Sequence, residues 1–123
     1  MAVTTTTASN PLVTTVVTDT DSDLTVELAA QGNKMLYAVE INNSANTVDP
    51  VYIHIIEATS GTVATQHDHQ LYCPAATTCY YYFPVGIETS TGIMFYASTT
   101  PGGGNGAVAP TENVTVILGF TAR

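Results

Sequence analysis

Residues 51–99, VYIHIIEATSGTVATQHDHQLYCPAATTCYYYFPVGIETSTGIMFYAST, decide the fold of this 123-residue chain. The runs at 51–58, 66–73, 78–83 and 93–97 are rich in Val, Ile, Thr, Tyr and Phe, and Gly, Pro and Ser residues separate them. Short runs of this composition between turn residues are typical of β-strands and hairpins, and nothing in the stretch has a helical period. The stretch therefore predicts one sheet, and the rest of the chain must supply a second.

The flanking sequence supplies further strands at 12–18, 24–29, 35–43 and 114–120. In the last of these, Val114, Val116, Leu118 and Phe120 share one face, a period of two that indicates a half-buried strand. The same period places Met35, Tyr37, Val39 and Ile41 on one face of residues 35–43. The total of about eight short strands predicts an all-β fold, an antiparallel β-sandwich of jelly-roll-like character.

The chain has the length of one domain, which we expect to span residues 12–123. Residues 1–11 are polar and include Thr4, Thr5, Thr6 and Thr7, so they have little apolar surface to bury. One interpretation is a frayed terminus. The other is an extended arm that becomes ordered along a neighbouring subunit, with the four threonines in the interface.

The charge balance excludes some partners. Ten acidic residues face two basic ones, Lys34 and Arg123, for a net charge of −8. Nucleic-acid binding requires clustered Lys and Arg, and anionic membranes attract the same residues, so we expect neither partner. No apolar run is long enough to span a membrane, and the N-terminus resembles no signal peptide, so we expect synthesis and assembly in a cytoplasm.

Three histidines are candidates for a metal site. His67 and His69 flank Asp68, and on a strand their imidazoles would share a face about 7 Å apart. His54 lies on an earlier strand that could be adjacent, and a threefold axis would multiply the nitrogen ligands. The alternative is an exposed polar strand edge. Because one chain supplies only part of a ligand set, we expect no metal and no cofactor.

The other acidic and sulfur-containing residues give weaker signals. Asp19, Asp21 and Asp23 alternate as in a calcium loop, but the glycine and distal glutamate of that loop are missing, so we expect a solvated turn. Cys73 and Cys79 bracket a five-residue segment that could be a hairpin loop, and a disulfide between them is geometrically feasible. In a cytoplasm they would instead be reduced thiols acting as small apolar groups.

Residues 80–83, Tyr-Tyr-Tyr-Phe, predict an interaction surface. On a strand, Tyr81 and Phe83 point to one face, and Tyr80 and Tyr82 point to the other. One face fills the core, and the other exposes two tyrosines, which are enriched at protein interfaces. Stacking on carbohydrate is the alternative. No Ser, Cys or Lys stands in a recognisable nucleophile motif, so we expect no enzyme.

With these features in place, the chain resembles a family of small virion structural proteins of tailed bacteriophages. The resemblance covers residues 34–120, and the segments that carry it are 36–43, 51–56, 61–65, 84–87, 91–93 and 114–118. Where that family usually has Gly-x-Thr-x-Pro, this chain has Gly61-Thr62-Val63-Ala64-Thr65, without the proline.

The resemblance implies a non-enzymatic capsid decoration, or cement, protein. Such a protein would be a homotrimer on the capsid surface of the virion, assembled in the host cytoplasm, and would bridge copies of the major capsid protein. The alternative is a tail, adaptor or fibre-base component that binds another virion protein or a host glycan.

Overall fold

The structure, a computed structural model, describes residues 3–7 and 13–123. The described residues form nine strands and no helix. The strands are β1 (Val3–Thr7), β2 (Thr15–Ser22), β3 (Glu27–Gln31), β4 (Lys34–Asn42), β5 (Val51–Ile56), β6 (His69–Cys73), β7 (Thr78–Thr89), β8 (Gly92–Ser98) and β9 (Val114–Ala122).

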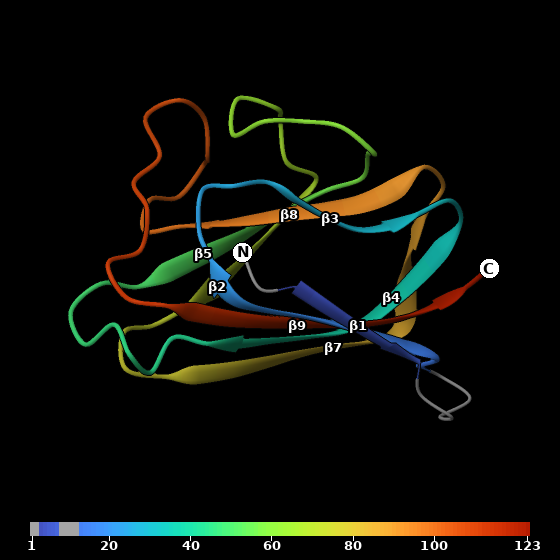
Figure 1. The fold of residues 1–123 in the computed structure, drawn as a ribbon, viewed down its shortest axis with the longest axis horizontal. Coiled ribbons are helices and arrows are strands. Elements are labelled where there is room, and N and C mark those ends of the chain that lie inside the picture. The colour runs from blue at the N-terminus through green and yellow to red at the C-terminus, as the bar shows by residue number, and fades with distance from the viewer. Residues whose placement is uncertain (1–2, 8–12) are drawn as a thin grey trace.

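The strands form two stacked antiparallel sheets (Figure 1). Sheet A has the order β1-β2-β9-β4-β7, and sheet B has the order β3-β8-β5-β6. The pairs β2–β9, β3–β8, β4–β7 and β5–β6 are nested within one another along the chain. This nesting is the topology of a jelly roll. The predicted antiparallel sandwich of jelly-roll type is confirmed, and β1 adds a ninth strand at one edge of sheet A.

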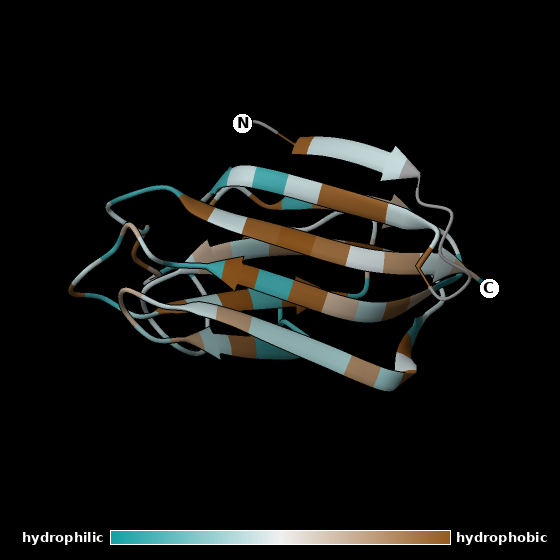
Figure 2. Cartoon of the chain, turned by 90° about the horizontal axis from the view of Figure 1, so that it is seen from below, coloured by the Kyte–Doolittle hydropathy of each residue, from teal (hydrophilic) through white to brown (hydrophobic). Residues whose placement is uncertain are grey.

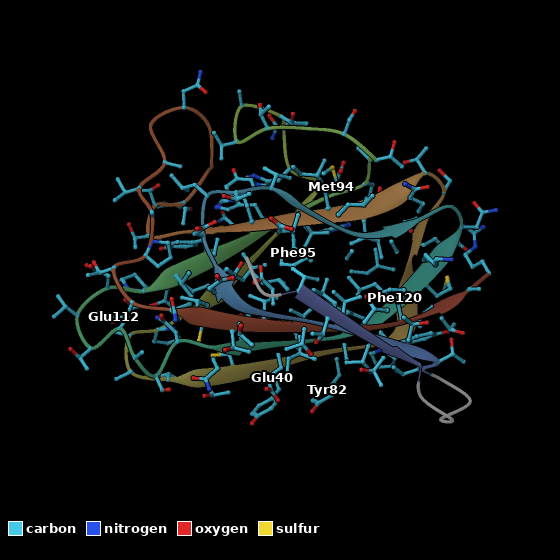
Figure 3. The ribbon with its side chains drawn as sticks, viewed as in Figure 1. Glu40, Tyr82, Met94, Phe95, Glu112 and Phe120 are labelled. Carbon is cyan, nitrogen blue, oxygen red and sulfur yellow. The ribbon has the colours of Figure 1, made fainter. Side chains whose placement is uncertain are left out.

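The hydrophobic core lies between the sheets because alternate residues of each strand point inward. Phe95 of β8 and Phe120 of β9 lie there, as Figure 3 shows. Burial of each such side chain contributes about 1.5–3 kcal/mol relative to exposure. The fully buried members of this core also include Val17, Leu36, Val39, Ile41, Val51, Ile53, Ile55, Ile93, Val116 and Leu118.

A bulge interrupts the alternation in β4. The register of β4 with both neighbours shifts between Leu36 and Ala38. As a result Leu36 and Val39 are both buried, whereas Tyr37 is only partly buried. The expectation that Met35 and Tyr37 share a face with Val39 is wrong, because the extra residue reverses the alternation on one side of the bulge.

β7 runs unbroken from Thr78 to Thr89, where the sequence predicts a break at Pro84 and Gly86. Its residues 83–86 oppose only Tyr37 of β4, so the irregularity of this pair lies in β7. Gly86 has a φ of +83°, a conformation that favours glycine. A Cβ atom at this position would lie 2.7 Å from Cε of Met35. Gly86 therefore permits the strand to bend across β4 without ending.

The outer face of sheet B is covered by the chain's own loops. All seven residues of β8 are buried, including the outward-pointing Met94 and Tyr96. In Figure 1, residues 57–68 and the first part of residues 99–113 lie over this sheet, and the rest of residues 99–113 runs along one end of the sandwich to β9. Two hydrogen bonds join these parts, because the carbonyl oxygen of Val63 accepts from Gly104 N at 2.8 Å and from Tyr96 Oη at 3.4 Å. The centre of sheet B is therefore buried on both faces, while Leu28 of β3 and Tyr72 of β6, on its edge strands, remain 37% and 45% exposed.

Candidate functional site

The outer face of sheet A, in contrast, has no described segment across its centre (Figure 2). Antiparallel register aligns its side chains into two rows that cross all five strands. One row is Thr6, Val16, Gly119, Ala38 and Tyr82, and the other is Thr4, Thr18, Ile117, Glu40 and Tyr80. Figure 3 shows Glu40 and Tyr82 projecting away from the sandwich interior. We call these ten residues the sheet A face.

A shallow hollow lies within the sheet A face. Its floor is made by the small residues Ala38 and Gly119, and the rings of Tyr80 and Tyr82 stand beside it. Its volume is about 180 Å³. The two rings are 57% and 71% exposed, which is unusually high for large apolar side chains on a sheet. The hollow is therefore an apolar recess with an aromatic rim.

The sheet A face is nearly free of charge. Glu40 is its single charged side chain, although the whole chain has a net charge of −8. The nearest described ion pair on this sheet, between Arg123 and Glu88, joins Nη2 to Oε2 at 3.6 Å and involves the ends of β9 and β7. Covering the face with a partner would therefore remove few charges from water, which keeps the cost of binding low.

The structure places four of the six residues that the sequence predicts as interface on one face of sheet A, but at its two opposite edges. Thr4 and Thr6 lie at one edge of the sheet A face, and Tyr80 and Tyr82 lie at the other. Four strand spacings separate the two pairs, roughly 19 Å. Thr5 pairs with the inward-pointing Val17, so it occupies the opposite face of β1.

Thr7 ends β1 opposite Thr15. Residues 1–2 and 8–11 of the predicted arm lie outside the described residues. Its central part pairs with β2 of the same chain rather than standing apart from the sandwich.

Sequence reasoning missed the middle of this face. Ala38 and Gly119 carry no chemical signal, and Val13, just before β2, lies beside Gly119 of the neighbouring β9. A Cβ atom on Gly119 would lie 3.0 Å from Cγ1 of Val13, so a larger residue would displace Val13 and fill the recess. The alternation of Val114, Val116 and Leu118 does indicate that Ile117 and Gly119 point outward, which was the available clue.

A second polar cluster lies under the loops of sheet B. His54 is fully buried, and its ring stacks on that of Tyr96 with centroids 4.4 Å apart. Its Nδ1 lies 3.2 Å from Nδ1 of His67, and its Nε2 lies 2.8 Å from Oγ of Ser98. Ser98 Oγ donates to the carbonyl oxygen of Thr100 at 2.6 Å. These contacts connect β5 and β8 to both covering loops.

The direction of these hydrogen bonds follows from the proton count. Because Ser98 uses its only hydroxyl proton on Thr100, its oxygen must accept from Nε2–H of His54. Neutral His54 then has a bare Nδ1, which accepts from Nδ1–H of His67. A histidine that activates a serine must accept the hydroxyl proton instead. The hydrogen bonds therefore run from His67 through His54 and Ser98 to Thr100, which is opposite to the direction needed to activate the serine. We call this chain of hydrogen bonds the structural relay, and Ser98 is fully buried within it.

Burial, followed by the charge of His67, lowers the pKa of His54 to about 4, although the carbonyl of Thr100 acts in the opposite direction. The buried imidazole therefore remains neutral at physiological pH, as the relay requires.

His67 and His69 do not share a face. β6 begins at His69, which pairs with the inward-pointing Ile55, whereas His67 precedes the strand and contacts the outward-pointing His54. The expectation of two imidazoles side by side on one strand face is wrong, because His67 lies in a loop. His69 Nε2 lies 3.8 Å from Oε1 of Glu57. Within residues 3–7 and 13–123, no three His, Cys, Asp or Glu side chains gather in a way that would hold a metal.

Cys73 and Cys79 are free thiols at a crossover between the sheets. Residues 74–77 connect β6 of sheet B to β7 of sheet A, so the expected hairpin loop is a connection between layers. Cys73 is fully buried, and its Sγ lies 3.3 Å from the carbonyl oxygen of Thr77. Burial, and then the neighbouring Cys79 thiol, raises the pKa of Cys73 to about 12. Such a thiol is a poor nucleophile.

Asp19 is buried inside the sandwich, where the sequence predicts a solvated turn. β2 continues to Ser22, and this places Asp19 on the same face as Val17. Its Oδ1 accepts from Asp21 N at 3.2 Å, while Oδ2 has no hydrogen-bond partner among the described residues. Burial first, and then the carboxylates of Asp21 and Glu27, raise its pKa to about 7, against the backbone hydrogen bond from Asp21.

A larger hollow of about 390 Å³ lies between residues 45–49 and residues 111–112. The amide of Asn46 crosses beside it, donating to Glu112 O at 3.2 Å and accepting from Glu112 N at 2.8 Å. Asn43 fixes the same loop by donating to the carbonyl oxygens of Asp49 and Pro74. These two buried amides hold the loop in place, so a structural role explains the geometry around this hollow.

Comparison of the sequence with models of known protein families finds no match, and no curated protein matches it. The described residues contain no helix that is long and apolar enough to span a membrane. The class that the fold and the site define is therefore a jelly-roll β-sandwich with one covered and one uncovered outer face.

Proposed function

We propose that this protein is a non-enzymatic structural component of a virus particle, a capsid decoration protein that binds the major capsid protein through the sheet A face. The observation that carries this proposal is the asymmetry of the sandwich. The loops bury the centre of the outer face of sheet B, while the sheet A face exposes Tyr80 and Tyr82 around a largely apolar recess in which Glu40 is the single charged side chain. Exposed aromatic residues around an apolar recess are typical of protein-binding surfaces.

The fold supports the virion setting by analogy. Jelly rolls are common in viral capsid proteins, but also in lectins and cupins, so the fold alone does not establish a function. The resemblance of residues 34–120 to small phage structural proteins favours the first of these. In this setting the protein lies on the capsid surface and is assembled in the host cytoplasm; the homotrimer is what the resemblance alone implies.

The interior of the sandwich argues against an enzyme of the cupin type. Cupin enzymes place metal-binding histidines inside the barrel, whereas here that space is filled by apolar side chains such as Ile53, Phe95 and Leu118. His54 points to the other face of sheet B and serves the hydrogen-bonded relay. Ser98 donates its proton away from His54, so this pair supplies no activated nucleophile.

The second candidate function is a tail, adaptor or fibre-base protein that binds a host glycan. Its support is also the pair of exposed rings, because tyrosines beside a shallow recess offer a stacking platform for a sugar. The absence of tryptophan from the sequence and the single charged residue on the face make this candidate the weaker one.

The test is the combined substitution Tyr80→Ser and Tyr82→Ser, assayed by binding to particles assembled without this protein. We expect at least tenfold weaker binding, because truncation of an aromatic residue at the centre of an interface typically costs about 2 kcal/mol or more. Both side chains are largely exposed, so thermal unfolding of the variant should match that of the wild type.

The matched control is Tyr52→Ser with Tyr72→Ser, which removes the other tyrosine pair, on sheet B, with ring centroids 5.3 Å apart. We expect the control to bind particles as the wild type does. Equal binding by both double variants would contradict the proposal. Cryo-electron microscopy of whole particles separates the two candidates, because a decoration protein follows the capsid lattice whereas a tail protein occupies one vertex.

A further inference from the structure

The sandwich has four edge strands, and one of them differs from the rest. β1, β3 and β6 each have five residues, whereas β7 has twelve. An edge strand presents unpaired N–H and C=O groups to any other strand, and proteins protect such edges with short strands, charges, prolines or bulges. The three short edges already have the first of these protections.

Protection of β7 is confined to its second half. Pro84, Gly86 and Glu88 lie there, together with the irregularity in which residues 83–86 of β7 oppose Tyr37 of β4. Residues 78–83, Thr-Cys-Tyr-Tyr-Tyr-Phe, contain no charge, no proline and no glycine. On its other side this segment pairs with β4 in regular register from Thr78 to Tyr82. It is therefore a straight, uncharged edge that is open to pairing.

The inward-pointing side chains along this edge are incompletely buried. Tyr81 and Phe83 pack against the core but remain partly exposed, whereas Val39 and Ile41 of the adjacent β4 are at most 1% exposed. The core therefore extends to this side of the sandwich without being closed there. A strand placed beside β7 would cover these apolar groups as well as the backbone.

We propose that residues 79–83 of β7 pair antiparallel with the same residues of a second copy, joining two copies of sheet A into one continuous sheet across a twofold axis. Self-complementary pairing of this kind is how twofold dimers form. The twofold dimer takes the place of the homotrimer that the resemblance implies. Tyr80 and Tyr82 belong to this edge and also to the sheet A face. The measurements below therefore use self-association of the chain, which involves no capsid and can fail separately from the proposed function.

The register follows from the side chains. Opposed residues in an antiparallel pair share a face, and a twofold axis that extends one sheet keeps each side chain on its own face. The axis must therefore pass through a residue that lies opposite its own copy. With Tyr81 on the axis, Tyr80 lies opposite Tyr82 of the second copy on the outer face, and Cys79 lies opposite Phe83 on the inner face. Every opposed pair is then aromatic or apolar, which favours pairing. Pro84, which has no N–H, ends the paired segment.

The first measurement is sedimentation equilibrium of the full chain. We expect a species of twice the 12.9 kDa chain mass at micromolar to millimolar concentration. A monomer that persists up to about 1 mM would overturn the proposal. So would a trimer, because one twofold contact cannot close a threefold ring.

Two charge variants then test the register. Tyr80→Lys with Tyr82→Lys places lysine opposite lysine at both outer positions, so the dissociation constant of the dimer should rise at least tenfold. Tyr80→Glu with Tyr82→Lys places Glu opposite Lys at the same two positions, so the dimer should persist. Net charge alone predicts the reverse order, because the lysine pair reduces the charge of −8 and the mixed pair preserves it.

The matched control is Thr4→Lys with Thr6→Lys, which adds the same two charges to the same face at the β1 edge. We expect it to dimerise as the wild type does. All substituted residues are exposed, and far-UV circular dichroism checks that each variant keeps its sheet. Equal dissociation of the two Tyr80 and Tyr82 variants would overturn the proposal.

Discussion

Two buried titratable residues give this sandwich an unusual dependence on pH. Asp19 has its pKa raised from 3.8 to about 7, and His54 has its pKa lowered from 6.5 to about 4. Ionisation of Asp19 favours the unfolded chain, so its contribution to stability falls as pH rises from about 4 to 7. Protonation of His54 also favours the unfolded chain, so its contribution falls as pH drops from about 6.5 to 4. Across the shared window the two slopes are opposite, and they largely cancel.

Asp19→Asn should therefore reveal the slope of His54. The amide cannot ionise, and its oxygen can still accept from Asp21 N. We expect the variant to gain stability relative to the wild type as pH rises from 4 to 8, by on the order of 3 kcal/mol. Urea unfolding at several pH values measures this gap. Asp49→Asn, in an exposed loop, is the control, and a gap that stays constant for Asp19→Asn would contradict the expectation.

His54→Gln should reveal the opposite slope. The amide can accept from His67 and donate to Ser98, but it loses the stacking on Tyr96 and is less stable at pH 8. Because the variant has no buried imidazole to protonate, its deficit relative to the wild type should shrink as pH falls from 7 to 4, by on the order of 3 kcal/mol. The same urea series checks this, and a deficit that grows on acidification would refute it.

At the scale of elements, β1 makes few stabilising contacts with the rest of the sandwich. It pairs only with β2, and Val3 is its contribution to the core, while Thr4, Thr5 and Thr6 are exposed. Viewed from the sequence alone, deletion of residues 2–10 should leave the melting temperature unchanged. The observed pairing changes this expectation.

Deletion of residues 2–10 should lower the free energy of unfolding by about 1–2 kcal/mol, because it removes one partly buried valine, Val3, and a short ladder of backbone hydrogen bonds. It also turns β2 into an edge strand, so weak self-association of the truncated chain should increase. Thermal unfolding and sedimentation check both effects. An unchanged melting temperature would mean that β1 adds nothing to the isolated domain, as expected of an arm that serves a neighbouring subunit.

At the scale of the whole molecule, the two sheets differ in what covers them. The loop at 57–68 and the first part of the loop at 99–113 lie over sheet B, and the buried relay from His67 to Thr100 ties them down. The connections within reach of sheet A leave its centre open. A partner that binds this protein therefore meets one open sheet surface, with Glu40 as the single charge among its ten residues, and one open strand edge, and the tyrosines of β7 belong to both.

The sequence by itself determined the class of fold and the type of surface. Period-two alternation gives strands whatever their partners, which is why the all-β sandwich and the outward direction of Tyr80 and Tyr82 are readable from residues 78–83. The predictions made from the sequence were wrong where the structure is irregular, at the bulge next to Tyr37, at His67 in its loop and at the buried Asp19. Each of these departs from local pattern, and only contacts between distant segments produce it.

Tertiary structure alone decided which side chains meet. Strand order brings Thr6 into one row with Tyr82 across residues 16, 119 and 38, although no spacing along the chain relates them. It also decided which face the loops cover, because either sheet has an apolar outer surface that burial would stabilise. The physical reason is that hydrophobic burial is non-directional, so a sequence pattern states how much apolar surface must be buried, while the topology selects what buries it.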